Sequence, residues 1–320
     1  MIKIGPLDKS SLNSHKASLR TKFFAEKPTA ASFKRGKPKD AVKKHSWIPN
    51  LLDHLEHHLD DILIGTPDIL TGLINNIATT FPEFYTYCRQ RPKNNQPTYD
   101  VHIELLLERL GKLFNYDGFS ARRKDWNAYS LVDAYAIRLC PYCQLAHVNF
   151  HLKEGDDKFS MRPPLDHFYP RSRYPFLAVS AYNLIPSCWQ CNSSVKSNDD
   201  PLDVALPHPC DQKTSISIKF CIAGYTKFKK ISSASDVQLN VTGRRATDKA
   251  FVNFFKLGRR YRWYREEILD LYRRHQKYED FDDIVKRMIP RREFVLGFAP
   301  SESRRRLIGI CLDGVADSLE

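Results

Sequence analysis

Apolar side chains recur every three or four residues along several stretches of the chain, which is the spacing of one face of an α-helix. The first stretch covers residues 47–63, and Thr66 with Pro67 then marks the start of a second helix over 69–77. The other helices expected from this spacing cover 101–114, 126–139 and 247–272, with one or two more before Glu320.

Extended segments are expected where the pattern changes to alternation between turns. They cover residues 147–152, 159–168, 183–188, 216–222, 225–231 and 237–241. Residues 1–45 mix Ser, Lys and Pro without a sustained period, so we expect a basic flexible arm there. These segments predict an α+β protein. Its units are the arm at 1–45, a helical region at 46–135, a core at 136–205, a small β segment at 206–242 and a basic helical C-terminal region at 243–320.

Composition excludes several classes of protein. The 320 residues are 42% hydrophobic and 12% aromatic, enough for a substantial core, which argues against a disordered or fibrous chain. No apolar run approaches the roughly 18 residues that a membrane span needs, and no secretory signal follows the first charged residues. We therefore expect a cytoplasmic protein, in which disulfides are rare.

The positive charge is concentrated towards both ends of the chain. Lys and Arg number 50 against 37 Asp and Glu, a net charge of +13. Residues 1–50 carry 12 basic and 3 acidic side chains, and residues 243–306 carry 18 and 10, whereas the segment between them is almost neutral. Such basic segments are typical of proteins that bind a polyanion, although they are equally compatible with solvated surfaces.

Four of the eight cysteines form two Cys-x-x-Cys pairs, Cys140 with Cys143 and Cys188 with Cys191. Random placement would give on the order of 0.2 such pairs. Two thiolates at the ends of each tight turn can bind one tetrahedral zinc ion, so we expect a structural Zn²⁺ site. A redox dithiol is the alternative for one pair, but it requires a thioredoxin-like context that the sequence lacks. The remaining cysteines, Cys88, Cys210, Cys221 and Cys311, are expected to be buried apolar residues.

A second group of polar residues lies between and just after these pairs. Asp166 and His167 stand in LDHFYPRS (165–172), Asn183 follows about sixteen residues after His167, and Asn192 directly follows the second pair in CWQCNSSVK (188–196). This combination, with both cysteine pairs, resembles the HNH endonuclease family over residues 136–203, about a fifth of the chain. The resemblance implies that residues 136–205 form a ββα-metal nuclease core stapled by the four-cysteine zinc.

The resemblance also implies a role for each polar residue. His167 would be the general base that activates water, Asp166 and Asn192 would be ligands of a catalytic Mg²⁺ or Mn²⁺ ion, and Asn183 would fix the loop between the strands. Many HNH proteins have His where this chain has Asn192, and this difference concerns the affinity for the catalytic metal ion rather than the activity. The candidate phosphate contacts are Arg171, Arg173 and Lys196.

Short strings outside the motif resemble a bacterial subgroup of HNH proteins that accompany ATPases in phage-defence modules such as Septu and some retrons. They are FYPRSRYP (168–175), NDDPLD (198–203), HPC (208–210) and the segment 255–261. This similarity implies a cytoplasmic bacterial effector with a partner ATPase or another defence-module protein. It does not extend to the 135 N-terminal residues, whose role the sequence leaves open.

These observations favour a metal-dependent endonuclease that hydrolyses DNA, with the two basic ends holding the nucleic acid. Two alternatives remain, namely a non-catalytic zinc-stabilised nucleic-acid-binding or adaptor protein and an HNH nuclease that cuts RNA. The sequence does not distinguish them, nor does it define the oligomeric state. A further cluster of His54, His57 and His58 has Leu55 where the zinc-protease pattern HExxH needs Glu, so a polar helix face is the better interpretation.

Overall fold

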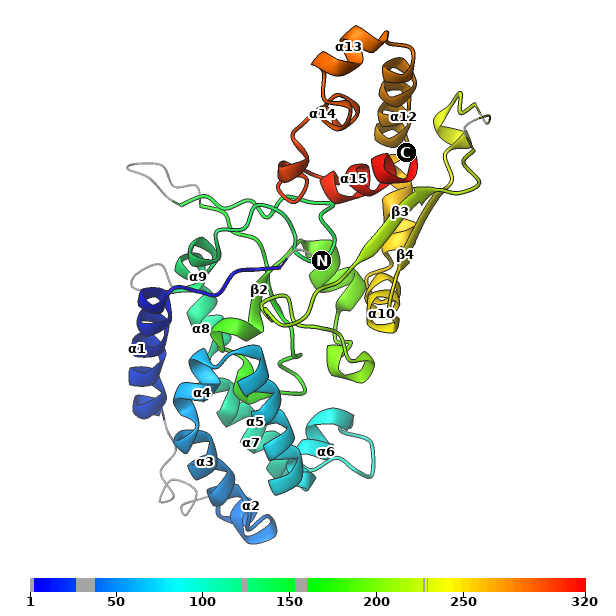
Figure 1. Cartoon of the computed structure of the whole chain (residues 1–320). Helices are drawn as coiled ribbons and strands as arrows, with labels where there is room; N and C mark the ends of the chain where they lie inside the picture. The colour runs from blue at the N-terminus through cyan, green and yellow to red at the C-terminus, as the bar shows by residue number, and fades with distance from the viewer. Residues whose placement is uncertain (1–2, 27–37, 122–125, 153–159, 227, 229) are drawn as a thin grey trace.

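The computed structural model describes residues 3–26, 38–121, 126–152, 160–226, 228 and 230–320. The protein is α+β, with helices at both ends of the chain and two small antiparallel sheets (Figure 1). The helices α1–α7 gather at one end of the molecule and α12–α15 at the other, with the described residues of 136–152 and 160–210 between them. No helix among the described residues is both long and apolar enough to cross a membrane.

The N-terminal half is a layer of helices, of which the hydrophobic spacing predicts those between residues 47 and 77, at 101–114 and at 126–139. They are α1 (Lys9–Glu26), α2 (Pro38–Lys44), α3 (Ile48–His57), α4 (Leu59–Ile64), α5 (Pro67–Thr80), α6 (Pro82–Gln90), α7 (Val101–Leu113), α8 (Tyr116–Ala121) and α9 (Ala128–Tyr135). The expected first helix is divided at His58, whose backbone leaves helical geometry. Proline opens α5 as predicted, but the Thr66 side chain makes no capping hydrogen bond. Helix α9 ends early because Ala136 adopts a left-handed conformation.

The expected flexible arm is wrong for the part that the structure describes. Residues 9–26 form α1, which buries His15, Leu19 and Phe23 along one face. His15 Nε2 donates to the Val179 carbonyl at 2.8 Å, and the Trp126 indole donates to His15 Nδ1 at 3.0 Å. The four-residue spacing of these three side chains is the helical signal that the many polar residues around them obscured. Residues 27–37 of the expected arm lie outside the described residues.

The central segment carries a short hairpin followed by a helical turn. Strand β1 (Leu165–His167) pairs antiparallel with β2 (Leu184–Pro186), so that Asp166 lies opposite Ile185. Three short helical turns, η1 (Pro175–Leu177), η2 (Ala181–Asn183) and the π-helical η3 (Gln190–Lys196), lie between or after the strands. Another turn, η4 (Pro201–Val204), completes the segment.

The second sheet joins the core to the C-terminal helices. Strand β3 (Ile218–Ile222) pairs antiparallel with β4 (Leu239–Gly243), close to two of the expected strands, and η5 (Ala234–Asp236) precedes β4. The described residues of the segment expected at 225–231 form no strand. Gly243 is required where it stands, because a Cβ atom there would lie 2.2 Å from the backbone of Asp248 and Lys249.

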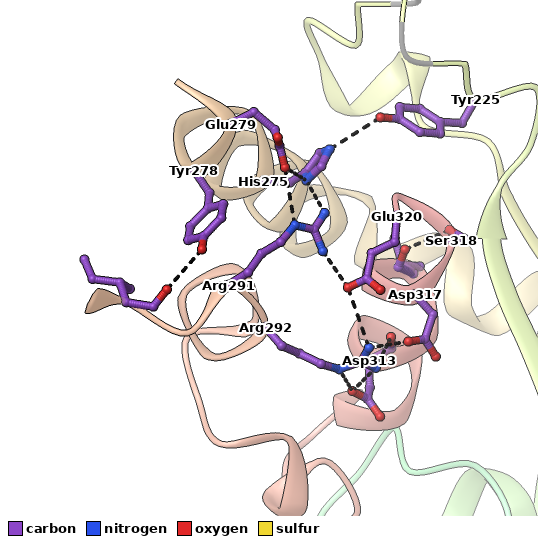
Figure 2. Close-up of polar contacts among 12 residues, drawn as sticks. Tyr225, His275, Tyr278, Glu279, Arg291, Arg292, Asp313, Asp317, Ser318 and Glu320 are labelled. Atoms are coloured by element: carbon purple, nitrogen blue, oxygen red, sulfur yellow. Dashed lines mark hydrogen bonds and ion pairs between the residues drawn. The ribbon is translucent and has the colours of Figure 1, made fainter. Parts of the chain in front are cut away.

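The C-terminal region is helical, and salt bridges hold its end in place. It contains α10 (Ala246–Phe254), α11 (Leu257–Arg260), η6 (Tyr261–Tyr264), α12 (Arg265–Glu279), α13 (Asp283–Met288), α14 (Arg291–Leu296), η7 (Pro300–Glu302) and α15 (Gly309–Ser318). Arg292 pairs with Asp313 and Asp317 of α15, while Arg291 pairs with Glu320 at 2.5 Å (Figure 2). Much of the positive charge of α14 is therefore neutralised within the protein.

Candidate functional site

The four cysteines of the two Cys-x-x-Cys pairs meet in one buried cluster. The sulfur atoms of Cys140, Cys143, Cys188 and Cys191 all lie within 4.8 Å of one another, and those of Cys143 and Cys188 are 3.8 Å apart. This distance is too long for a disulfide, but it is the separation of about 3.8 Å that zinc–sulfur bonds of about 2.3 Å produce in a tetrahedron. The cluster therefore suits a metal ion such as Zn²⁺.

Local hydrogen bonds prepare both turns for metal binding. The backbone N–H of Leu145 donates to Cys143 Sγ, and that of Cys191 donates to Cys188 Sγ, each at 3.4 Å. Hydrogen bonds from neighbouring thiols, that of Cys140 first, lower the pKa of the Cys188 thiol. Both effects favour the thiolate form at Cys143 and Cys188, whereas burial raises the pKa of the Cys140 thiol, so a bound cation is what would make all four sulfurs thiolates.

Residues far along the chain brace this cluster. Arg260 Nη1 lies 3.2 Å from Cys191 Sγ, where it offsets thiolate charge, and the Tyr261 hydroxyl donates to the Cys143 carbonyl at 2.7 Å. Gln144, which has a positive φ of 56°, donates to the Ser303 carbonyl and accepts from the Ile310 N–H. No local pattern in the sequence marks Arg260, Tyr261 or Gln144 for this role.

Asn183 fixes the connection between the two strands of the hairpin. Its buried side chain donates to the carbonyls of Tyr169 at 3.1 Å and Leu177 at 2.9 Å, and its Oδ1 accepts from the Tyr169 N–H at 2.7 Å. These hydrogen bonds give the connection a defined conformation. Ala178 directly follows Leu177, one of the two residues whose carbonyls Asn183 binds.

His167, the last residue of β1, is held as a neutral imidazole. Its Nε2 atom lies 2.9 Å from the Ala178 carbonyl, which can only accept, so Nε2 carries the proton and Nδ1 keeps a lone pair. The Tyr116 ring packs edge-on against the imidazole with centroids 4.5 Å apart. Desolvation by this packing lowers the His167 pKa to about 3. The imidazole is therefore neutral near neutral pH with a lone pair at Nδ1, and its low pKa makes it a weak base in this conformation.

Asp166 is enclosed by two side chains that each bind one of its oxygens. Lys196 Nζ lies 3.0 Å from Oδ1, and the Tyr142 hydroxyl donates to Oδ2 at 2.6 Å. All three residues are only 1% exposed. Mg²⁺ would need a carboxylate oxygen at about 2.0–2.1 Å and several waters around it. The arrangement therefore does not fit the catalytic ion that the resemblance implies at Asp166 and Asn192.

The candidate phosphate contacts have different positions. Lys196 is buried and also donates to the His167 carbonyl at 2.7 Å, so its assignment as a phosphate contact is wrong for this arrangement. Arg173 forms a salt bridge with Asp203 at 2.9 Å. Arg171 is exposed, with Asp117 at 3.2 Å and its guanidinium 5.6 Å from the Tyr116 ring centroid.

A cavity of about 320 Å³ lies next to residues that contact His167, although His167 itself does not line it. Tyr116 and Ala178, the two residues that contact the His167 ring, both line it, and Arg91 and Arg171 contribute its basic groups. Asn192 stands on η3, half-buried, with its backbone N–H bonded to the Cys188 carbonyl at 3.0 Å. The charged residues of the cavity are Arg91, Arg171 and Asp117, and the two arginines pair with Glu104 and Asp117. No pattern in the sequence marks Arg91 or Tyr116 for this position.

Comparison of the chain with protein-family models, with curated proteins and with solved structures gave no match.

Proposed function

We propose that the protein is an HNH-type endonuclease that hydrolyses DNA phosphodiester bonds. The observation that carries this proposal is the neutral His167 imidazole, hydrogen-bonded through Nε2 to Ala178 and placed on a hairpin beside the four-cysteine cluster. The order of the elements, two antiparallel strands and then the helical turn η3 that bears Asn192, is the order that the resemblance implies.

In the proposed reaction, His167 Nδ1 takes a proton from the water that attacks phosphorus. The bond between phosphorus and the 3′ oxygen breaks, and the departing 3′ oxygen takes a proton from solvent water. The Nε2 hydrogen bond of His167 holds the ring in place, and Asn183 supports that bond by anchoring Leu177, the neighbour of Ala178. Arg91 and Arg171, which pair with Glu104 and Asp117, line the cavity next to Tyr116 and Ala178 and would supply positive charge for a phosphate. The chain's own residues therefore account for removal of the proton from water and for phosphate binding.

Two metals enter the proposal differently. The four cysteines would hold a structural Zn²⁺, which contributes directly to folding. Mg²⁺ or Mn²⁺, implied by the resemblance, would stabilise negative charge on the phosphate, but the enclosed Asp166 does not fit it, and no step is assigned to it here.

The decisive experiment compares His167→Ala with the unchanged protein on supercoiled plasmid DNA in Mg²⁺ or Mn²⁺. We expect cleavage to fall by about 10²- to 10⁴-fold, because a positioned general base contributes a factor of that size. His147→Ala, which alters an exposed histidine of the same segment, serves as the matched control and should cleave normally. Full cleavage by His167→Ala would show the proposed mechanism to be wrong.

A non-catalytic nucleic-acid-binding or adaptor protein is the second candidate, because Asp166 is already neutralised by Lys196. It would bind DNA in a salt-sensitive way without cutting it. Parallel assays on RNA separate the RNA-cutting alternative. The proposed setting is a bacterial cytoplasmic defence module with a partner ATPase, and co-expression with that partner tests whether cleavage depends on it.

A further inference from the structure

The Asp166 carboxylate belongs to a closed, charge-balanced unit. One oxygen accepts from Lys196 at 3.0 Å and the other from Tyr142 at 2.6 Å, and no member of the trio is more than 1% exposed. The Tyr142 ring is stacked on Phe255 with centroids 4.6 Å apart, so the hydroxyl is held in position. A carboxylate that is removed from water in this way needs a partner charge, and Lys196 provides it.

A divalent cation would have to use the same oxygen atoms. An ion bound at about 2.0–2.1 Å from a carboxylate oxygen would lie close to the ammonium that already contacts that oxygen. One buried carboxylate can balance one neighbouring charge, and repulsion between the ammonium and the ion has little solvent to screen it. Lys196 and the ion therefore cannot both occupy the Asp166 carboxylate.

The position of Lys196 links this exclusion to the helical turn. It is the last residue of η3, a π-helical segment in which the Ser197 N–H bonds to the Asn192 carbonyl, and Ser197 follows with a positive φ of 50°. Short π-helical segments are rare in proteins, and those that occur often lie at functional sites. Because Lys196 also binds the His167 carbonyl, release of the end of η3 would free both Asp166 and the backbone of His167.

We propose that Lys196 competes with a divalent cation for Asp166, so that the conformation described here is a closed state of the site from which Mg²⁺ and Mn²⁺ are excluded. This inference rests on the proposed function, since it names how the same site is regulated. Opening requires the Lys196 ammonium to leave the carboxylate, and the cation then takes its place as the partner of the negative charge. The bound cation stabilises the open state in turn.

The test measures Mn²⁺ binding in the absence of nucleic acid. The buffer contains no free metal other than the added Mn²⁺, and no chelator, so that the zinc site stays loaded. Mn²⁺ is followed by its electron paramagnetic resonance signal and by the thermal midpoint of the protein. We expect the unchanged protein to bind weakly and its midpoint not to move. Lys196→Met should bind Mn²⁺ at least about tenfold more tightly, melt lower in its absence, and recover when Mn²⁺ is added.

Two controls make the assignment specific. Lys112→Met removes an exposed lysine and should change neither Mn²⁺ binding nor its effect on the midpoint. Adding Asp166→Asn to Lys196→Met should abolish the gained binding. If Lys196→Met does not fold, Lys196→Gln removes the charge but keeps a donor for the His167 carbonyl, and it should gain Mn²⁺ binding that Asp166→Asn removes.

The proposal is overturned if the unchanged protein binds Mn²⁺ tightly through Asp166, or if neither Lys196→Met nor Lys196→Gln gains binding. These outcomes are independent of cleavage. Gained Mn²⁺ binding together with full cleavage by His167→Ala would uphold the competition and refute the proposed mechanism. If no Lys196 variant gains Mn²⁺ binding while His167→Ala loses cleavage, the competition is refuted and the proposed mechanism is kept.

Discussion

The loop between β1 and β2, residues 168–183, is held in a defined conformation by hydrogen bonds from two side chains, Asn183 and His15. Asn183 binds it from within through three hydrogen bonds, and His15 of α1 binds the Val179 carbonyl from outside. The neighbouring carbonyl, that of Ala178, orients His167. The proposed general base thus depends on contacts from residues that are distant along the chain.

The buried His15 makes stability sensitive to acid. Desolvation lowers its pKa to about 4, and protonation of Nδ1 would break the bond from Trp126. Below pH 6.5 His15 becomes protonated in the unfolded chain, whereas in the folded chain it stays neutral down to about pH 4. The free energy of unfolding therefore falls as the pH falls. His15→Gln should reduce the loss between pH 6.5 and 5 by about 2 kcal/mol, measured by urea unfolding at each pH.

The matched control for this experiment is His57→Gln on α3, an exposed histidine. It should leave the slope of stability against pH unchanged. An equal slope in His15→Gln and the unchanged protein would contradict the assignment. His208, also buried and with its pKa lowered to about 3 by desolvation, contributes in the same direction and remains in both variants.

Two cysteine pairs form the metal cluster at the scale of elements. One pair precedes β1, and the other runs from just beyond the end of β2 into the first turn of η3. Each pair donates two sulfur atoms, so the cluster ties the start of the central segment to the start of η3 across 44 intervening residues. The hairpin itself has only three residue pairs. A bound ion would therefore supply cohesion that so short a sheet cannot provide alone.

We expect Cys140→Ser to lose the metal and unfold the central segment, because structural zinc contributes on the order of 10 kcal/mol to small zinc modules. Metal analysis should find about one zinc per chain in the unchanged protein, and circular dichroism should report the loss of structure. Cys221→Ser, a half-buried cysteine on β3, is the control and should keep both the zinc and the fold. Folded protein purified without zinc would refute this prediction.

Positive charge is distributed unevenly over the whole molecule. On α14 the arginines are engaged with acidic residues of α12 and α15 and with Glu320, as Figure 2 shows. In contrast, Lys256, Arg259 and Arg262 are exposed around α11 and η6, beside the 87% exposed Trp263. Arg260 of the same segment contacts the cysteine cluster. This exposed segment is a better candidate DNA contact than α14.

Replacing Lys256, Arg259 and Arg262 by Ala should weaken DNA binding by the proposed nuclease and flatten its dependence on salt. Each lost phosphate contact lowers the slope of log K against log salt by about 0.9. Fluorescence anisotropy of a labelled duplex over a series of salt concentrations measures this slope. Lys112→Ala on α7 is the control, and an unchanged slope in the triple variant would exclude this segment.

Sequence pattern predicted helices close to α3, α4, α5, α7 and α9 and both strands of the small sheet, because amphipathic spacing reflects local geometry. It failed for α1, where three buried positions are separated by polar residues, and for 225–231, where the described residues form no strand. The cysteine cluster was predictable because both pairs have the spacing of metal ligands. The enclosure of Asp166 was not, since Tyr142 and Lys196 are 24 and 30 residues away from it.

The sequence by itself determined which chemical groups the protein has: two cysteine pairs, a histidine beside an aspartate, and basic segments near both ends. Only the tertiary structure decided which of these groups are available. It gathered the four cysteines, gave His167 a defined tautomer through Ala178, and buried Lys196 against Asp166. The physical reason is that residue type sets what a side chain can bind, whereas packing between distant segments sets its partner and its access to water.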